Sequence, residues 1–145
     1  MKHLCESNVF LALALASHPH HAKAVAFMDL LPDEESVYFC RLTQQSFLRL
    51  LTLEALMKED VRTNSEAIDV WRKLRLDIRV GFIRDDPDGV EACWLKLARY
   101  GSPAPKRWMD AYLAALAINL EMRFVTFDRG YRQYRSAGLD LLCLE

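Results

Sequence analysis

Three acidic residues stand at positions where a carboxylate is costly unless it has a partner. Glu6 and Asp128 each follow a short apolar run, and Asp110 lies in the first turns of an otherwise apolar segment. Carboxylates that are buried or clustered repel one another and lose hydration. A hard divalent ion, Mg²⁺ or Mn²⁺, could hold all three ionised, because it binds carboxylate oxygens and keeps several waters. The chemistry that this pattern predicts is metal-assisted hydrolysis of a phosphodiester by metal-activated water.

Each acid also has a purely structural interpretation. Asp110 could complement the positive end of a helix dipole. Asp128, which precedes Arg129 and Gly130, could form an Asx-turn or cap a short helix. Glu6 could be a solvated charge at a helix start. The chemical interpretation therefore depends on whether the three carboxylates lie close together in space.

The surrounding pattern predicts that they do. The segment Trp108–Leu120 is apolar at nearly every position, which indicates a helix buried on most sides, and Arg123–Phe127 reads as the strand that follows it. Four further strands are expected, separated by helices, at Lys2–Cys5, Val37–Cys40, Ile78–Ile83 and Leu139–Leu144. Alternating strands and helices favour an α/β sandwich with a mainly parallel sheet. Ligands of such sheets bind beyond the carboxyl ends of the strands, and all three acids are expected at that edge.

Length and composition limit the remaining possibilities. With 145 residues, of which 52% are hydrophobic, the chain is expected to form a single domain over residues 1–145. The formal net charge is −1, so binding of a polyanion would need a local basic patch. No apolar run is long enough to span a membrane. The four cysteines have no zinc-site spacing, which favours free thiols in a reducing cytoplasm.

Basic residues near the acids suggest a nucleic-acid partner. Four of them flank the proposed site: Lys106, Arg107, Arg129 and Arg132. Together with neighbouring aromatic residues they would suit a single RNA strand, with phosphates on the cations and bases on the rings. The alternative is an ordinary solvated face. A second basic group, Arg72, Lys73 and Arg75, is expected to be plain surface, and the histidines of the His18–His21 segment are expected to be solvated rather than metal-bound.

Four pieces of the chain carry a resemblance to a known family. They are Glu6–Leu13, Arg41–Thr52, Trp108–Ala115 and Val125–Tyr131. In this order and spacing they resemble the PIN-domain ribonucleases, and in particular the VapC-type toxins of bacterial toxin–antitoxin pairs. The likeness covers nearly the whole chain.

The resemblance implies a three-layer α/β/α sandwich around a five-stranded parallel sheet. It also implies Mg²⁺- or Mn²⁺-dependent endonucleolytic cleavage of RNA, a homodimer, and inhibition by a small antitoxin protein. The metal and catalytic acids would be Glu6, Asp110 and Asp128, and Asn8 and Thr126 would hold the carboxylates in place.

Two positions depart from the family pattern. The first acid is usually Asp and is Glu6 here, and a further acid near the start of the third helix falls on the neutral Gln44, with Gln45 as the alternative register. Gln44 is expected to orient a metal-bound water instead of binding the ion. These departures leave a second hypothesis open, in which a degenerate PIN-like module binds RNA or a protein partner without catalysis.

Overall fold

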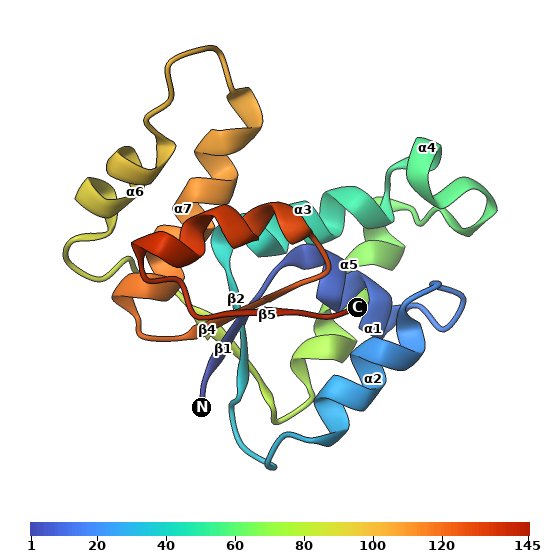
Figure 1. The fold of residues 1–145 in the computed structure, drawn as a ribbon. Helices are drawn as coiled ribbons and strands as arrows, with labels where there is room; N and C mark the ends of the chain where they lie inside the picture. Colours follow the sequence, from blue (N-terminus) through green and yellow to red (C-terminus); the bar gives the residue numbers. More distant parts are fainter.

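Five short parallel strands form the middle layer of the protein, which a computed structural model describes over residues 1–145 (Figure 1). The strands are β1 (His3–Cys5), β2 (Val37–Cys40), β3 (Val80–Ile83), β4 (Arg123–Thr126) and β5 (Leu141–Cys143). They lie in the order β3-β2-β1-β4-β5, and every neighbouring pair is parallel. The predicted five-stranded, mainly parallel sheet is confirmed, and all its strands end at one edge.

Helices cover both faces of this sheet (Figure 1). One layer contains α1 (Ser7–Ala14), α2 (His21–Asp29), α3 (Arg41–Leu51) and α5 (Asn64–Arg75). The other contains α6 (Val90–Ala98), α7 (Pro105–Asn119) and the 3₁₀ helix η2 (Arg129–Ala137). The short elements α4 (Glu54–Met57) and η1 (Lys58–Asp60) connect α3 to α5. The protein is therefore the expected three-layer α/β/α sandwich.

The strands supply both halves of the core because their side chains alternate between the two faces. Leu4 and Phe124 point into the cluster shared with α6, α7 and η2. Cys5, Phe39 and Val125 point into the cluster shared with α1, α3 and α5. All five side chains are almost completely buried. Continuous apolar strands of this kind are typical of a sheet covered on both faces.

Helix α7 is the apolar helix that the sequence predicted, but its first turn is more open than expected. It begins at Pro105, a residue suited to the first helical position because its fixed φ matches the helix. Ala111 and residues 113–117 are buried, as predicted. Trp108 and Met109, by contrast, keep 53% and 50% of their surface exposed. The first turn of α7 therefore faces solvent and leaves room for a site.

Helix α5 begins with a capping box. The backbone N–H of Glu66 donates to Thr63 Oγ1 at 3.1 Å, and the Glu66 carboxylate accepts from the Thr63 N–H at 3.0 Å. All four cysteines are free thiols. None of the helices combines the length and apolarity needed to span a bilayer.

One glycine in the sheet is required by a side chain on the neighbouring strand. Gly81 of β3 pairs in register with Tyr38 of β2, and the Tyr38 ring lies directly against it. A Cβ atom added to Gly81 would come within 2.5 Å of a ring carbon of Tyr38. The sheet can therefore bury this aromatic ring only because the facing position lacks a side chain.

Replacing Gly81 with Ala is expected to lower the free energy of unfolding by about 1–3 kcal/mol, since the buried Tyr38 ring must move to admit the methyl group. Urea denaturation measures this. Gly101→Ala is the matched control, because a Cβ there meets nothing within 4 Å, and its effect should stay within about 0.5 kcal/mol. Equal losses in the two variants would contradict the packing argument.

Candidate active site

Glu6 lies at the carboxyl end of β1 and caps α1 by position, but its side chain is used elsewhere. The residue occupies the N-cap position with extended backbone and makes no side-chain capping bond. Its carboxylate instead accepts hydrogen bonds from Asn8 Nδ2 at 3.2 Å and from the Thr126 hydroxyl. The pKa of Glu6 is raised to about 7, mainly by burial; the Thr126 hydrogen bond opposes this change, and the nearby carboxylates of Asp128 and Asp110 add to it.

Asp128 lies at the carboxyl end of β4, the strand next to β1. Its backbone N–H donates to Thr126 Oγ1 at 2.9 Å, and its Oδ1 accepts from the Gly130 N–H at 2.8 Å, which caps η2. The buried Thr126 hydroxyl also accepts from Asn8 Nδ2 at 3.3 Å. Thr126 and Asn8 therefore join the ends of β1 and β4 and fix the Glu6 carboxylate between them.

Asp110 reaches the same region from the second turn of α7. Its Oδ1 accepts a hydrogen bond from the hydroxyl of Tyr131, a buried residue of η2, at 3.0 Å. Burial raises the pKa of Asp110, while the Tyr131 donor and the Lys106 ammonium oppose that change. The pKa of Tyr131 is also raised, by burial first and then by the charges of Glu6, Asp110 and Asp128. The buried Tyr131 hydroxyl is therefore close enough to all three acids to be affected by their charges.

Lys106 is the cation that these acids share. Its Nζ lies 3.2 Å from Asp128 Oδ2 and 3.8 Å from Asp110 Oδ2. The Lys106 side chain is 77% exposed, so it can leave without disturbing the core. In this conformation no three His, Cys, Asp or Glu side chains converge closely enough to hold one metal ion. The three acids face one region, but the ammonium separates the two aspartates, and the expected tight cluster is not formed.

The donor set nevertheless fits a hard divalent cation. Glu6, Lys106, Asp110 and Tyr131 line a common hollow of about 130 Å³. The three acids outnumber the single lysine, and the ammonium already stands where a positive charge is needed. Carboxylate oxygens beside a small solvent-accessible space are the ligands that Mg²⁺ and Mn²⁺ prefer.

Helix α3 contributes to this hollow through residues that the sequence did not single out. Thr43 and Ser46 line it, together with Leu42. Gln44 does not: its Oε1 accepts from Arg41 Nη1 at 2.5 Å, and it lines a separate hollow. Gln45, the alternative register, is exposed and lines neither hollow. The signal was the three-residue spacing of Thr43 and Ser46, which places both on one helical face.

The basic residues predicted to hold RNA are mostly engaged within the protein. Arg107 donates to the Leu97 carbonyl at 3.1 Å and to Gln133 Oε1 at 2.6 Å. Arg129 and Arg132 both form ion pairs with the same partner, Glu145, at 3.1 and 2.5 Å. Of the four residues, only Lys106 directly contacts the acids.

The histidine segment has structural contacts. The His20 ring stacks on Phe127 with 4.6 Å between ring centroids. A ring nitrogen of His21 lies 2.8 Å from the Ala12 carbonyl oxygen, and His18 accepts the His20 N–H at 3.0 Å. These contacts give the three histidines a local role, and they do not converge on a metal site.

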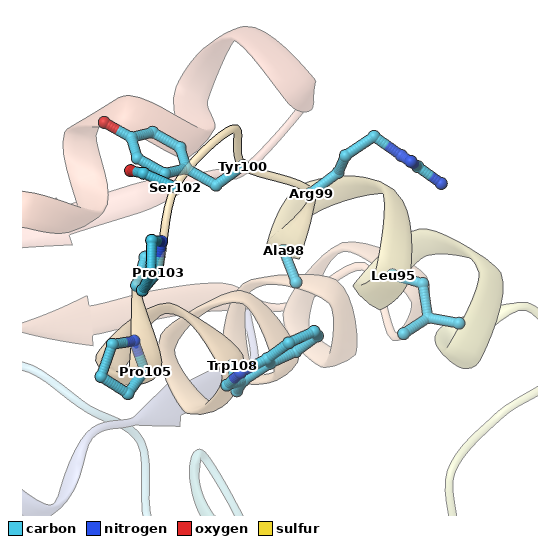
Figure 2. Close-up of a pocket in the computed structure, with 9 residues that line it drawn as sticks. Leu95, Ala98, Arg99, Tyr100, Ser102, Pro103, Pro105 and Trp108 are labelled. Atoms are coloured by element: carbon cyan, nitrogen blue, oxygen red, sulfur yellow. The ribbon is translucent and has the colours of Figure 1, made fainter.

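A much larger hollow than that beside Glu6 and Asp110 lies away from the acids. It measures about 610 Å³ and is bounded by α6, the loop that follows it and the start of α7 (Figure 2). Figure 2 shows the Trp108 ring along one side, with Leu95 and Pro105 at its two ends. No carboxylate or histidine lines it. Size therefore does not identify the reactive site, since the carboxylates line the small hollow at the sheet edge.

Known proteins are similar to this chain in sequence and in fold. The model of the PIN domain family matches residues 4–137. Ribonuclease VapC41 of Mycobacterium tuberculosis is 42% identical over 142 residues, which cover 96% of this chain and 97% of the relative.

Solved structures agree in fold at much lower identity. The crystal structure of Mycobacterium tuberculosis VapC20, described as a sarcin-ricin loop cleaving toxin, has a TM-score of 0.64 at 17% identity and covers 95% of this chain and 96% of that chain. The structure of VapBC-1 from nontypeable Haemophilus influenzae has a TM-score of 0.64 at 16% identity, covering 99% and 98%. Family model, relative and fold agree: the chain belongs to the PIN domain family.

Proposed function

We propose that this chain, as a single domain over residues 1–145, is a Mg²⁺- or Mn²⁺-dependent endoribonuclease and the toxin of a toxin–antitoxin pair. One observation carries the proposal: Glu6 and Asp110 line one small hollow at the carboxyl edge of the sheet, and Asp128 reaches it through the exposed Lys106 ammonium, which contacts both aspartates. The 42% identical relative named a ribonuclease supports the same reaction.

The three carboxylates would hold the divalent ion. When bound, the ion would activate water and neutralise negative charge on the phosphodiester. The protein's own groups prepare this site. Asn8 and Thr126 fix the Glu6 carboxylate, and the Tyr131 hydroxyl fixes one oxygen of Asp110. Such outer contacts orient ligands and raise affinity for a metal.

Lys106 has a second role in this proposal. Its ammonium contacts both aspartates, and the side chain is long and exposed enough to turn outward when Asp110 and Asp128 bind a metal ion instead. The released ammonium would then lie beside the substrate and offer a positive charge to the scissile phosphate. This residue supports RNA as the substrate more directly than the three arginines that are already engaged elsewhere.

The proposed partners are an antitoxin protein, the RNA substrate and a second copy of the chain in a homodimer. VapBC structures among the fold neighbours support the antitoxin. The free thiols are consistent with action in the cytoplasm.

A non-catalytic module is the alternative, and one observation favours it: no three acidic or histidine side chains converge as a closed metal site. In that case the carboxylates would be held permanently by Lys106, and RNA or a protein partner would bind without cleavage.

Replacing Asp110 or Asp128 with Asn is expected to lower the RNA cleavage rate by about 100-fold or more, since each variant loses a charged oxygen donor for the metal and about 2.7 kcal/mol of transition-state stabilisation is then missing. Cleavage of single-stranded RNA with Mg²⁺ or Mn²⁺ measures this. Asp69→Asn, an exposed acid on α5, is the matched control and should retain full activity. Undiminished cleavage by both site variants would exclude the proposed function.

Replacing Glu6 with Gln is expected to stabilise the metal-free protein by roughly 1–3 kcal/mol at pH 8. The pKa of Glu6 rises from 4.5 to about 7 on folding, so the folded state binds more protons and the wild type loses stability as the pH rises from 4.5 to 7. Glu6→Gln removes that loss, and the two proteins should converge near pH 4, where Glu6 is protonated in both states. Denaturation in EDTA as a function of pH measures the difference.

The wild type and the Glu6→Gln variant also distinguish the metal-dependent endoribonuclease from the non-catalytic module. Millimolar Mg²⁺ or Mn²⁺ should raise the melting temperature of the wild type and have a smaller effect on Glu6→Gln, because an ion stabilises only the folded state that binds it. No gain in the wild type would favour the non-catalytic module.

A further inference from the structure

A second hollow at the carboxyl edge of the sheet is lined by arginines. It measures about 380 Å³ and lies between the ends of β2 and β3, α3 and α5. Its lining consists of three arginines, two aromatic residues and one amide: Arg41, Arg75, Arg84, Trp71, Phe82 and Gln44. No acidic side chain is among them. We call it the arginine pocket.

The three guanidinium groups of the arginine pocket have no anionic partner. None of them takes part in any ion pair of the protein. Arg41 donates to the neutral Gln44. The Nε of Arg75 is shielded from solvent and has no hydrogen-bond partner within the protein, which is costly for a charged donor. Arg75, expected from the sequence to be plain surface, is therefore partly buried and incompletely satisfied.

Aromatic rings hold these cations in place. The Arg75 guanidinium lies 5.7 Å from the Trp71 ring centroid and 5.5 Å from that of Phe82, and the Arg41 guanidinium lies 4.8 Å from Phe82. Stacking on rings orients planar guanidinium groups and leaves their N–H edges free for a ligand. Three like charges around one hollow repel one another, and an anion within it would remove that repulsion. Arginine forks match the oxygens of a phosphate.

The position of the arginine pocket relates it to the acids. In the sheet order, β3 is two strands from β1, so the ends of these strands are about 10 Å apart. Helix α3 lines both hollows: Arg41 and Gln44 face the arginine pocket, and Thr43 and Ser46 face the acids. A single-stranded nucleic acid could therefore contact both with only a few nucleotides between them.

We propose that the arginine pocket binds one backbone phosphate of the RNA substrate, a few nucleotides from the bond that is cleaved. The inference rests on the proposed function and adds a substrate-binding site to it. The pocket selects for negative charge and not for base identity, so it positions the strand without reading its sequence. It also accounts for RNA binding by a chain whose net charge is −1.

The test neutralises one partner at a time. A single-stranded RNA of about a dozen nucleotides, with one methylphosphonate at each position in turn, is bound in EDTA to the full-length wild type and to an Arg41→Gln/Arg84→Gln variant. Both arginines are exposed, so their replacement should leave the fold intact.

For the wild type, one neutral position away from the cleavage site should weaken binding roughly 10- to 100-fold. For the variant, the unmodified RNA should show that loss already, and the same methylphosphonate should add nothing.

Arg72→Gln/Lys73→Gln is the matched control. It removes the same charge from exposed positions of α5 that do not line the arginine pocket. The slope of log affinity against log salt should fall by about 0.7 for a lost phosphate contact in the arginine-pocket variant, with a smaller change in the control. Arg75→Lys, which keeps the charge and loses the fork, should fall between wild type and the double variant.

Two outcomes would overturn the inference. If the arginine-pocket variant binds unmodified RNA as tightly as the control, the pocket does not hold the strand. If the methylphosphonate effect persists unchanged in that variant, the sensitive phosphate contacts another site. Either result leaves the proposed function standing, because cleavage and its loss in the Asp110 and Asp128 variants are measured separately; a wild type that neither binds nor cleaves RNA would overturn both.

Discussion

The burial of neighbouring carboxylates at the carboxyl edge of the sheet is the constraint around which the site is built. Burial above all, with a smaller contribution from the other acids, raises the pKa of Glu6 to about 7, and burial also raises the pKa of Asp110. Folding brings these groups together although they disfavour one another, and the hydrophobic packing of α7 and the strands outweighs that cost. Because these carboxylates lie close together, a cation beside them, such as the Lys106 ammonium, is bound favourably.

The parallel sheet is what makes this convergence possible. The Glu6 N–H donates to the Val125 carbonyl at 2.9 Å, which continues the pairing of β1 with β4 beyond the last strand residue. That contact fixes Glu6 beside Thr126 and the chain leading to Asp128. Helix α7, which precedes β4, starts near the same edge and delivers Asp110. Residues more than a hundred positions apart therefore meet because of strand order and not because of local sequence.

Much of this arrangement could be predicted from the sequence, because strand–acid junctions and apolar alternation are local signals. The five strands, the buried part of α7 and the shared edge of Glu6, Asp110 and Asp128 all followed from such signals. The exact direction of α3 side chains did not: Gln44 was expected at the acids, and the helix turns it toward Arg41. One residue of helical phase, about 100° of rotation, decides between the two hollows.

The partners of the arginine side chains were the second feature that the sequence did not reveal. Arg129 and Arg132 lie near Asp128 in sequence, which suggested that they would face RNA, yet Glu145 neutralises both. Arg75 appeared to be an ordinary helix-surface residue. Trp71 lies one helical turn before it, but the sequence does not show that Phe82 of β3 also packs against its guanidinium group. Whether an arginine is available depends on which acid reaches it, and that is a property of the assembled fold.

Helix α3 has a consequence for the geometry of cleavage. Its first two turns form the wall between the acids and the arginine pocket, so the separation of the two hollows is set by helical pitch rather than by a flexible loop. An RNA strand anchored on one side would present the same internucleotide bond on the other each time. The number of nucleotides between the bound phosphate and the cleaved bond would then be constant.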